Sequence, residues 1–182
     1  GHLGKLQVKT PAASIDFLCN GWLLYQLTAC RLWGRTALYQ SGGAFGFRDQ
    51  LQDGMALCAT APQMARAQIL LSASRQFPQG DAQHWWHQQS GAGERTTCSD
   101  DYLWLVQATC RYVEATGDRE ILDEKITYLE GPLLKQGESD HYFIPEVSAY
   151  EETLREHCRR ALAHPPPPAP PRPPRPATRP ET

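Results

Sequence analysis

The sequence predicts an all-α protein, a helical toroid with long loops that form a site at one end. Apolar side chains recur at helical spacing in several segments, and no segment shows a convincing alternation of apolar and polar residues. Long connections follow every second helix or so, and loops of that length commonly carry function. The predicted helices cover residues 15–33, 48–60, 62–76, 100–116, 118–124 and 149–163.

Local signals place the ends of these helices. Ser14 is expected to cap the first helix, and Pro62 occupies a favoured first-turn position of the third. Gly117 suits the left-handed residue that ends a helix. Ser148, with Glu151 three residues later, forms a capping box that predicts the start of the last helix. The three long loops are expected at 40–47, 77–97 and 131–147.

The chain divides into a folded body, residues 1–163, and a proline-rich tail, residues 164–182. Ten of the last eighteen residues are proline, and the others are Ala, Arg, Thr and Glu. This segment therefore lacks most backbone donors and has almost no apolar side chain to bury. We expect it to be disordered or in polyproline II conformation. The body alone is long enough to bury one hydrophobic core.

Charge and cysteine content exclude several classes of protein. The formal net charge is −2, and the arginines of the tail leave the body more acidic still, which disfavours nucleic acid or an anionic membrane as a partner. We find no apolar stretch of membrane-spanning length and no N-terminal signal-peptide pattern. Six scattered cysteines form no CxxC pair and are typical of reduced thiols. A cytoplasmic location is therefore expected.

Two adjacent acids, Asp100 and Asp101, follow Ser99 and precede a strongly apolar run. Ser99 is a natural N-cap, which would place both carboxylates in the first turn of a buried helix. Such carboxylates can act in acid–base chemistry, and they can equally be helix-dipole partners. A helix N-terminus lowers a carboxyl pKa, whereas burial and a neighbouring like charge raise it. Because burial has the larger effect, it can keep one acid protonated.

Polar and aromatic side chains gather beside the predicted loops. These clusters are residues 47–50 with Asp53, residues 84–87, Glu94 with Arg95, and the two adjacent acids. Rings that stack on pyranose faces, together with planar polar groups that bond hydroxyls, are what a sugar-binding cleft needs. Trp85 and Trp86 can alternatively be loop anchors packed on the core. The residues alone favour a carbohydrate-active helical enzyme.

Two other chemistries fit the sequence poorly. His84 and His87 with Cys98 match no standard metal-ligand spacing and lack a fourth ligand, so no metal is expected. A cysteine protease built from Cys98 and His84 has no supporting signature.

Three motifs follow one another along the chain: YQSGGAFGFRDQLQD at 39–53, GDAQHWWH at 80–87 and RTTCSDDYLWL at 95–105. In this order they resemble glycoside hydrolase family 94, which contains the cellobiose, chitobiose and β-1,2-oligoglucan phosphorylases. Residues 7–11 and 22–26 are similar to the subgroup of cyclic β-1,2-glucan synthetases, where the phosphorylase-like domain is C-terminal. The resemblance covers about residues 3–162.

The resemblance implies a partial (α/α)6 barrel and inverting phosphorolysis or glycosyl transfer on β-glucans, with the β-1,2 linkage favoured. By the motif match, Asp100 is the general acid that protonates the leaving oxygen, while inorganic phosphate attacks from the opposite face. Other matching residues would bind or border the substrate: Arg48, Asp49 and Asp53 at the donor subsite, His84, Trp85 and Trp86 on the acceptor side, and Asp101 in support. Inorganic phosphate is the implied co-substrate, and no cofactor is implied.

The sequence departs from the family pattern near Leu162, where a proline-rich tail replaces the later helices and phosphate-binding residues. We therefore expect a truncated or frame-shifted segment that is inactive alone. It would lie in the cytoplasm, or at the inner membrane if it belongs to a membrane-bound synthetase. A second hypothesis is a non-catalytic glucan-binding or scaffold domain whose tail binds a partner, because 170–173 has PxxP spacing. The coding DNA past Leu162, translated in all three frames, distinguishes the two.

Overall fold

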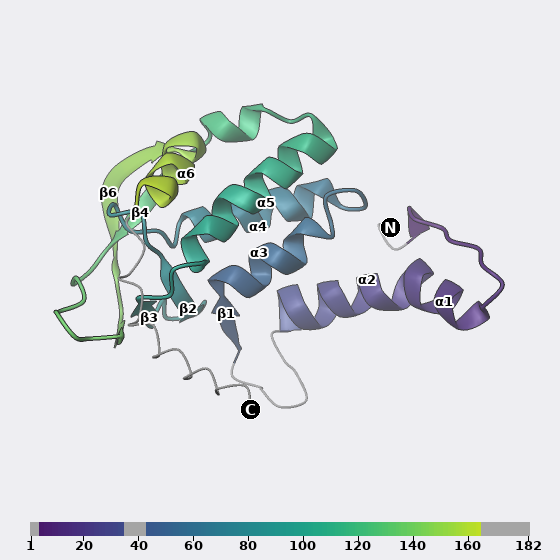
Figure 1. Cartoon of the computed structure of the whole chain (residues 1–182), viewed down its shortest axis with the longest axis horizontal. Helices are drawn as coiled ribbons and strands as arrows, with labels where there is room; N and C mark the ends of the chain where they lie inside the picture. Colours follow the sequence, from purple (N-terminus) through teal and green to yellow (C-terminus); the bar gives the residue numbers. More distant parts are fainter. Residues whose placement is uncertain (1–3, 35–42, 165–182) are drawn as a thin grey trace, which may run out of the picture.

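The computed structural model describes residues 4–34 and 43–164 (Figure 1). The helices are α1 (Ala13–Phe17), α2 (Leu23–Gln26), α3 (Phe47–Met55), α4 (Pro62–Ala73), α5 (Asp101–Thr116) and α6 (Leu154–Ala163). The strands are β1 (Ala44–Gly46), β2 (Gln83–His87), β3 (Gly93–Thr96), β4 (Lys125–Glu130), β5 (Asp140–Phe143) and β6 (Glu146–Thr153). Apart from its first residue, the predicted proline-rich tail lies outside the described residues.

The N-terminal helical run confirms the helix predicted over 15–33. α1 and α2 alternate with two π-helical segments, Leu18–Trp22 and Leu27–Gly34, so the backbone stays helical throughout. The predicted cap at Ser14 is wrong, because the helix starts two residues earlier than predicted and Ala12 occupies the N-cap position. Among the described residues, no helix combines the length and the apolar character needed to cross a membrane.

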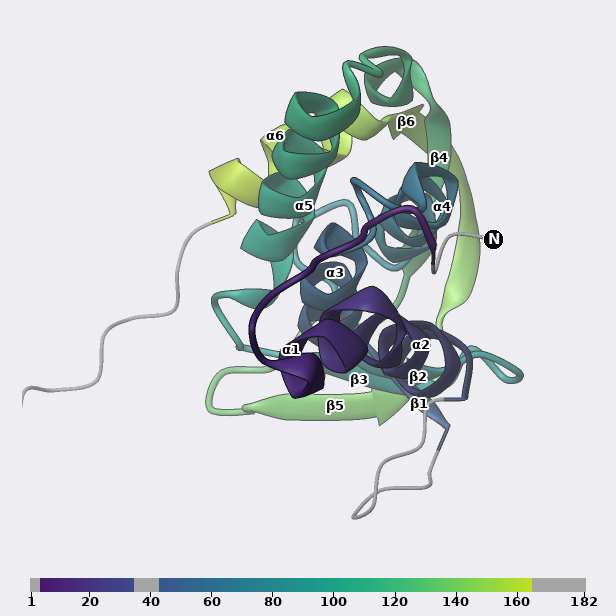
Figure 2. The same ribbon diagram turned by 90° about the vertical axis from the view of Figure 1, so that its right-hand side faces the viewer.

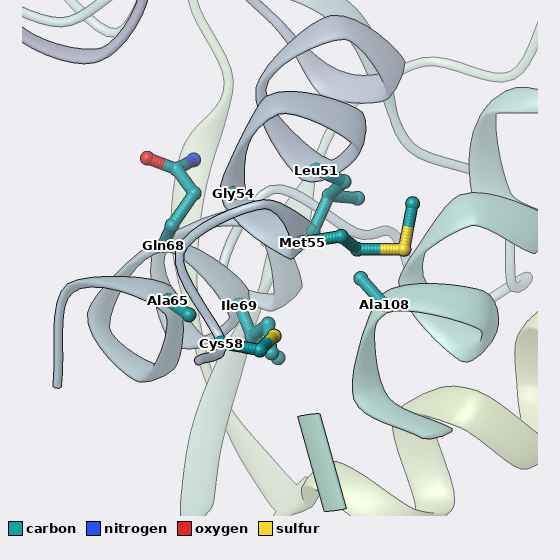
Figure 3. Close-up of a pocket in the computed structure, with 8 residues that line it drawn as sticks. All are labelled: Leu51, Gly54, Met55, Cys58, Ala65, Gln68, Ile69 and Ala108. Atoms are coloured by element: carbon teal, nitrogen blue, oxygen red, sulfur yellow. The ribbon is translucent and has the colours of Figure 1, made fainter. Parts of the chain in front are cut away.

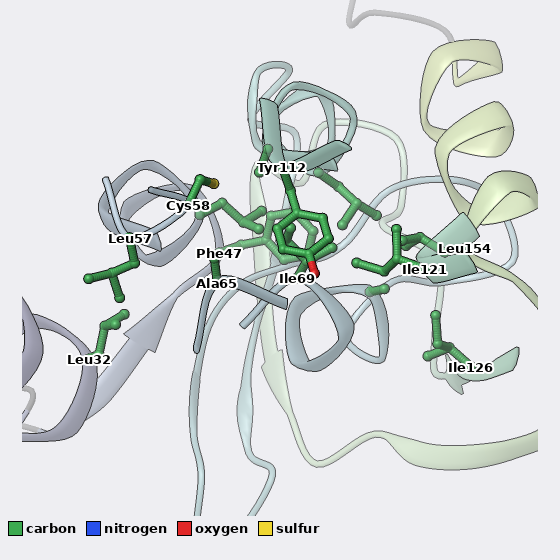
Figure 4. Close-up of a cluster of buried hydrophobic side chains, with 14 of the residues drawn as sticks. Leu32, Phe47, Leu57, Cys58, Ala65, Ile69, Tyr112, Ile121, Ile126 and Leu154 are labelled. Atoms are coloured by element: carbon green, nitrogen blue, oxygen red, sulfur yellow. The ribbon is translucent and has the colours of Figure 1, made fainter. Parts of the chain in front are cut away.

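Helices α3, α4 and α5 pack against one another and enclose the hydrophobic core (Figure 1). Phe47, Leu51, Leu57 and Leu105 are fully buried at its centre. Figure 4 shows Leu32 of the N-terminal run facing Leu57, so this run extends the same core. The helices predicted at 48–60, 62–76, 100–116 and 118–124 correspond to α3, α4, α5 and a single 3₁₀ turn at Glu120–Asp123.

The contact among these three helices is closely packed. Figure 3 shows Leu51 and Met55 of α3, Ile69 of α4 and Ala108 of α5 converging on one point. The space between them has no room for a water molecule, as expected of a protein interior at crystal-like density. This region is core, and it packs the second half of α3 and the middle of α5 against α4.

Strands β1, β2, β3 and β5 form a four-stranded antiparallel sheet in that order. Figure 2 shows this sheet beneath α3, with the helices on one side of it. Phe45 and Trp86 are buried on the helix-facing side, here called the inner face, with ring centroids 5.7 Å apart. Trp85 lies on the opposite side, the outer face, because successive strand residues alternate. β1 occupies the end of the loop predicted at 40–47, whose first residues lie outside the described part.

The prediction of an all-α fold is wrong, since 48% of the described residues are helical and 21% lie in strands, in two antiparallel sheets. The loops predicted at 77–97 and 131–147 contain β2, β3, β5 and part of β6. Two of these strands, β2 and β3, lack the regular alternation of apolar and polar residues by which strands are recognised. In β3 the buried positions are Gly93, which has no side chain, and Arg95, which is charged. In β2 the register shifts at His84, which interrupts the period of two.

Strands β4 and β6 form the second sheet, and α6 follows β6 directly. The capping box predicted at Ser148 is wrong, because that residue lies inside β6. Thr153 caps the helix instead, and its hydroxyl accepts a hydrogen bond from the backbone N–H of Glu156 at 3.3 Å. Thr153 and Glu156 repeat the spacing of Ser148 and Glu151. Pairing of β6 with β4 as far as Thr153 decides which of the two boxes starts the helix.

A buried ion pair holds the β2–β3 hairpin to the body. Nε of Arg95 donates to Oδ2 of Asp81 at 2.6 Å, and Nη2 donates to Oδ1 at 2.8 Å, the bidentate geometry that suits a guanidinium. Nη1 donates to the carbonyl of Pro132 at 2.9 Å, and the guanidinium lies 4.0 Å over the ring of Phe77. One side chain therefore joins the hairpin, the segment before it and the connection between the two sheets.

We predict that Arg95→Ala lowers the free energy of unfolding by about 3–5 kcal/mol, because it leaves the buried carboxylate of Asp81 without its cation. Urea denaturation followed by circular dichroism measures this change. Arg155→Ala is the matched control, since it removes an arginine whose ion pair with Asp123 is largely exposed and should cost at most about 1 kcal/mol. Equal losses in the two variants would contradict a special role for the buried pair.

Candidate functional site

Helix α5 places two neighbouring carboxylates in different surroundings. The helix starts at Asp101, and Asp100 is the residue before it, with no capping bond from its side chain. Ser99 is therefore not the N-cap, contrary to the sequence prediction. The side chain of Asp100 is 48% exposed, whereas that of Asp101 is 3% exposed. One acid is open to a ligand and the other is enclosed.

Three donors surround the carboxylate of Asp100. Sγ of Cys98 donates to Oδ1 at 3.1 Å, Nη1 of Arg48 donates to Oδ2 at 3.1 Å, and Nε1 of Trp104 lies 3.4 Å from Oδ2. The bond from Cys98, then those from Arg48 and Trp104, lower the pKa of Asp100, although burial acts in the opposite direction. From the sequence, burial was expected to be able to keep one of the two acids protonated. For Asp100 the hydrogen bonds outweigh the effect of burial on the pKa, because this side chain is half exposed.

Asp101 is bound to His84 of β2. Nδ1 of His84 donates to Oδ2 of Asp101 at 2.6 Å. This bond raises the pKa of His84 against the effect of burial, because a carboxylate partner favours the imidazolium. Oδ1 of Asp101 is buried and has no hydrogen-bond partner within the part of the chain that the structure describes. The contact fixes the hairpin against the N-terminal end of α5, beside Asp100.

Arg48 and Asp49 occupy the first turn of α3, shortly after β1 ends at Gly46. Arg48 links two acids of the site: its Nη1 lies 3.1 Å from Oδ2 of Asp100, and its Nε lies 3.6 Å from Oδ1 of Asp49. The hydrogen bond to Asp100 raises the pKa of Arg48. The structure thus brings together three predicted site residues at the adjacent N-terminal ends of α3 and α5.

The remaining predicted site residues lie farther from Asp100 in the fold. Trp86 is fully buried in the core, with the guanidinium of Arg75 5.4 Å from its ring, so it affects a ligand only through its neighbours. Trp85 lies on the outer face of the sheet. Asp53 is near the end of α3, where its Oδ2 accepts a hydrogen bond from Nε of Arg31 at 2.7 Å. That ion pair ties α3 to the N-terminal helical run.

Three groups of the site could hold a cation. A ring nitrogen of His84, Sγ of Cys98 and a carboxylate oxygen of Asp101 lie within 4.8 Å of one another. The histidine is already bonded to Asp101, and burial and then the bond to Asp100 raise the pKa of the Cys98 thiol to about 11. A cation would have to displace both protons, since metal ligands are deprotonated. His87, which the sequence suggested as a ligand, contacts Trp85 on the outer face instead.

Two of the three partners of Asp100 were not predicted from the sequence. Trp104 stands four residues after Asp100 at the start of a predicted helix, and this spacing places side chains on one face, so a signal was present. Cys98 lies just before the helix in irregular backbone, where no periodicity predicts a contact. Tyr142 on the outer face of the sheet was also missed, because β5 itself was not predicted.

Two neighbouring carboxyl groups, one of them exposed, are chemistry that enzymes acting on glycosidic bonds use. The family model described as "Glycosyl hydrolase 94 superfamily, catalytic domain" matches residues 1–165. The chain belongs to this family, which confirms the resemblance seen in its motifs.

Curated relatives agree with this assignment. The chain is 46% identical over 159 residues to the cyclic beta-(1,2)-glucan synthase NdvB of Rhizobium meliloti (strain 1021), covering 87% of this chain and 6% of that protein. It is 31% identical over 155 residues to an N,N'-diacetylchitobiose phosphorylase of Vibrio proteolyticus, covering 70% of this chain and 19% of that protein. The solabiose phosphorylase of Paenibacillus borealis is 30% identical over 125 residues, covering 69% and 15%. The chain thus spans less than one fifth of each relative.

We predict that His84 titrates above its ordinary pKa of 6.5 and that Asp101→Asn lowers this pKa, because burial then acts without the carboxylate. Imidazole chemical shifts in an NMR pH titration measure the effect. Asp100→Asn is the matched control and should leave the pKa of His84 nearly unchanged, since Asp100 is not among its partners.

The same pair makes stability depend on pH. The folded-state pKa of His84 is raised, so its stabilisation is fully present below about 6.5 and is lost as the pH rises through the higher folded value. The gap in free energy of unfolding between the wild type and Asp101→Asn should therefore be wider at acidic than at alkaline pH. A gap that widens with rising pH would contradict the assignment.

Proposed function

We propose that this chain supplies the general acid and part of the sugar-binding site of an enzyme that performs inverting phosphorolysis or glycosyl transfer on β-glucans. The observation behind the proposal is the contrast between the two acids, with Asp100 exposed beside Arg48 and Asp101 enclosed against His84. A general acid must reach the glycosidic oxygen, and of the two carboxylates Asp100 is the one open to a ligand. Asp101 then has a positioning role.

Asp100 has to hold a proton when the glycosidic oxygen arrives. The bonds from Cys98, Arg48 and Trp104 favour its charged form. A sugar hydroxyl or a phosphate oxygen that engages Arg48 would weaken one of these bonds, and the pKa of Asp100 would then rise. The acid therefore gains its proton as the substrate binds. Phosphate is already an anion, so the attack needs no second carboxylate as a base.

The neighbouring side chains suggest how the sugar is held. Arg48 and Asp49 offer paired donors and acceptors to the hydroxyls of the donor sugar. His84 and Trp85 border the acceptor side, since both belong to the strand fixed against the end of α5. Trp86 and Asp53 support these residues from within, through the core and through the ion pair with the N-terminal run.

The substrates follow from the relatives' names. One relative is a cyclic beta-(1,2)-glucan synthase, which favours the β-1,2 linkage, and two are phosphorylases, which favour inorganic phosphate as co-substrate. We propose no cofactor, and activity that survives dialysis against a chelator would support this. A location in the cytoplasm, or at the inner membrane, stays a prediction.

We predict that Asp100→Asn abolishes catalysis, with a loss of at least about 10²-fold, the usual contribution of a positioned acid. To measure this, residues 3–163 of this chain replace the matching segment within the Rhizobium meliloti synthase relative. The graft is given β-1,2-gluco-oligosaccharides and phosphate, and the glucose 1-phosphate that it releases is measured. The unmodified graft should be active.

Asp123→Asn in the same graft is the control, because that exposed aspartate lies in the 3₁₀ turn after α5 and should leave the rate unchanged. Full activity of Asp100→Asn would contradict the proposal. The chain alone is assayed in parallel, and no release of glucose 1-phosphate is expected from it. A graft that binds β-glucan without turnover would favour the second hypothesis, a glucan-binding or scaffold domain.

A further inference from the structure

The outer face of the four-stranded sheet presents one residue from each strand in a continuous row. Gly46 of β1 is paired with Trp85 of β2, Trp85 with Glu94 of β3, and Glu94 with Tyr142 of β5. Residues paired in this way lie side by side on the same face. We call these four residues the outer-face row. It crosses the whole sheet and carries two aromatic rings.

The two rings lean toward each other over the glutamate between them. The ring centroids of Trp85 and Tyr142 are 5.5 Å apart, although their strands are separated by β3, and the ring planes are tilted by 33°. Nε1 of Trp85 donates to Oε2 of Glu94 at 2.7 Å, which holds the indole in place. The side chain of Tyr142 is 54% exposed. The row therefore offers a fixed aromatic surface with a carboxylate at its centre.

The other end of the row meets the candidate active site. A Cβ added at Gly46 would lie 3.3 Å from Oδ2 of Asp49 and on the same face as Trp85. Because position 46 has no side chain, the carboxylate of Asp49 is adjacent to the end of the row. Asp49 in turn contacts Arg48, which contacts Asp100. Polar and aromatic groups thus continue from the proposed acid across the sheet to Tyr142.

We propose that the outer-face row is an extension subsite that binds the acceptor-side glucosyl units of a β-linked oligosaccharide, an inference that rests on the proposed function. Aromatic rings stack on the apolar faces of pyranose rings, and the carboxylate of Glu94 accepts bonds from hydroxyls at their edges. Glu94 has this capacity left, because a carboxylate accepts more than the single bond from Trp85.

Two features favour a sugar over an ordinary stabilising ladder. A ladder gains its stability by burying facing side chains, yet Tyr142 at one end of the row is mostly exposed and Gly46 at the other end has no side chain to bury. The row also mixes rings with a carboxylate, which suits a ligand with apolar faces and hydroxyl edges. Trp85, which the proposed function places on the acceptor side, and the continuity of the row with Asp49 and Asp100 favour the acceptor end of the same oligosaccharide as that ligand.

The test measures binding of β-1,2-linked glucotetraose to the full chain by calorimetry, with the indole N–H resonance of Trp85 followed by NMR. Trp85→Ala and Tyr142→Ala should each weaken binding about tenfold, the effect of losing one aromatic stacking contact. Tyr142→Phe keeps the ring and should bind as the wild type does. The Trp85 resonance should shift on addition of the tetraose.

Trp22→Ala and Tyr25→Ala are the matched controls, because they remove exposed aromatic residues of the N-terminal helical run. They should leave binding unchanged. Equal affinity in Tyr142→Ala and the wild type would overturn the subsite, as would an unmoved Trp85 resonance or an absence of binding. Failure of the proposed function is observed separately, as a graft whose release of glucose 1-phosphate does not depend on Asp100.

Discussion

The buried pair of Arg95 and Asp81 is the contact on which the rest of the site depends. β3 has few apolar residues to bury, because its inward positions are a glycine and this arginine. The hairpin therefore stays on the core through a satisfied charge instead of through apolar surface alone. Breaking such a pair is costly because it leaves one charge buried without a partner. The position of His84, and with it the site, follows from this anchor.

The anchored β2–β3 hairpin gives different surroundings to Asp100 and Asp101, which are neighbours in the sequence. His84 reaches from β2 to Asp101 and encloses it at the start of α5, so Asp100 is left outside the core. Arg48, in the first turn of α3, forms an ion pair with the exposed Asp100. Two neighbouring carboxylates thus acquire different surroundings from different elements, which is how environment, and not residue type, assigns roles in acid–base sites.

Helices were predictable from the sequence and strands were not, for reasons visible in single residues. The helical segments around Leu51 and Leu105 bury one face of regular spacing. Their starts were predicted within one residue, although the helix around Leu51 ends five residues before its predicted end. Strand β3 buries Gly93 and Arg95, and the shift in register at His84 breaks the alternation in β2. A pattern search for alternating apolar residues has nothing to detect in these two strands, whereas the first residues of β4 do alternate and were overlooked.

The same limit applies to the site. The motifs that suggested Arg48, Asp49 and Asp100 proved to converge at two helix ends, although the contacts Asp100 makes with Cys98 and Trp104 were not foreseen. The final capping signal was misplaced by five residues, since Ser148 and Thr153 offer equal local chemistry and only pairing with β4 distinguishes them. Long-range contacts made these choices, and local sequence does not encode them.

The assignment of the proton to Asp100 is tested most directly by the dependence of the rate on the leaving group. In the graft, Asp100→Asn and Asp101→Asn are compared on β-1,2-glucobiose and on a dinitrophenyl β-glucoside, whose leaving group departs without protonation. If Asp100 is the acid, its variant loses activity on glucobiose and regains it on the activated substrate. Asp100 is not the acid if Asp100→Asn is equally impaired on both substrates while Asp101→Asn is the variant that the activated substrate rescues.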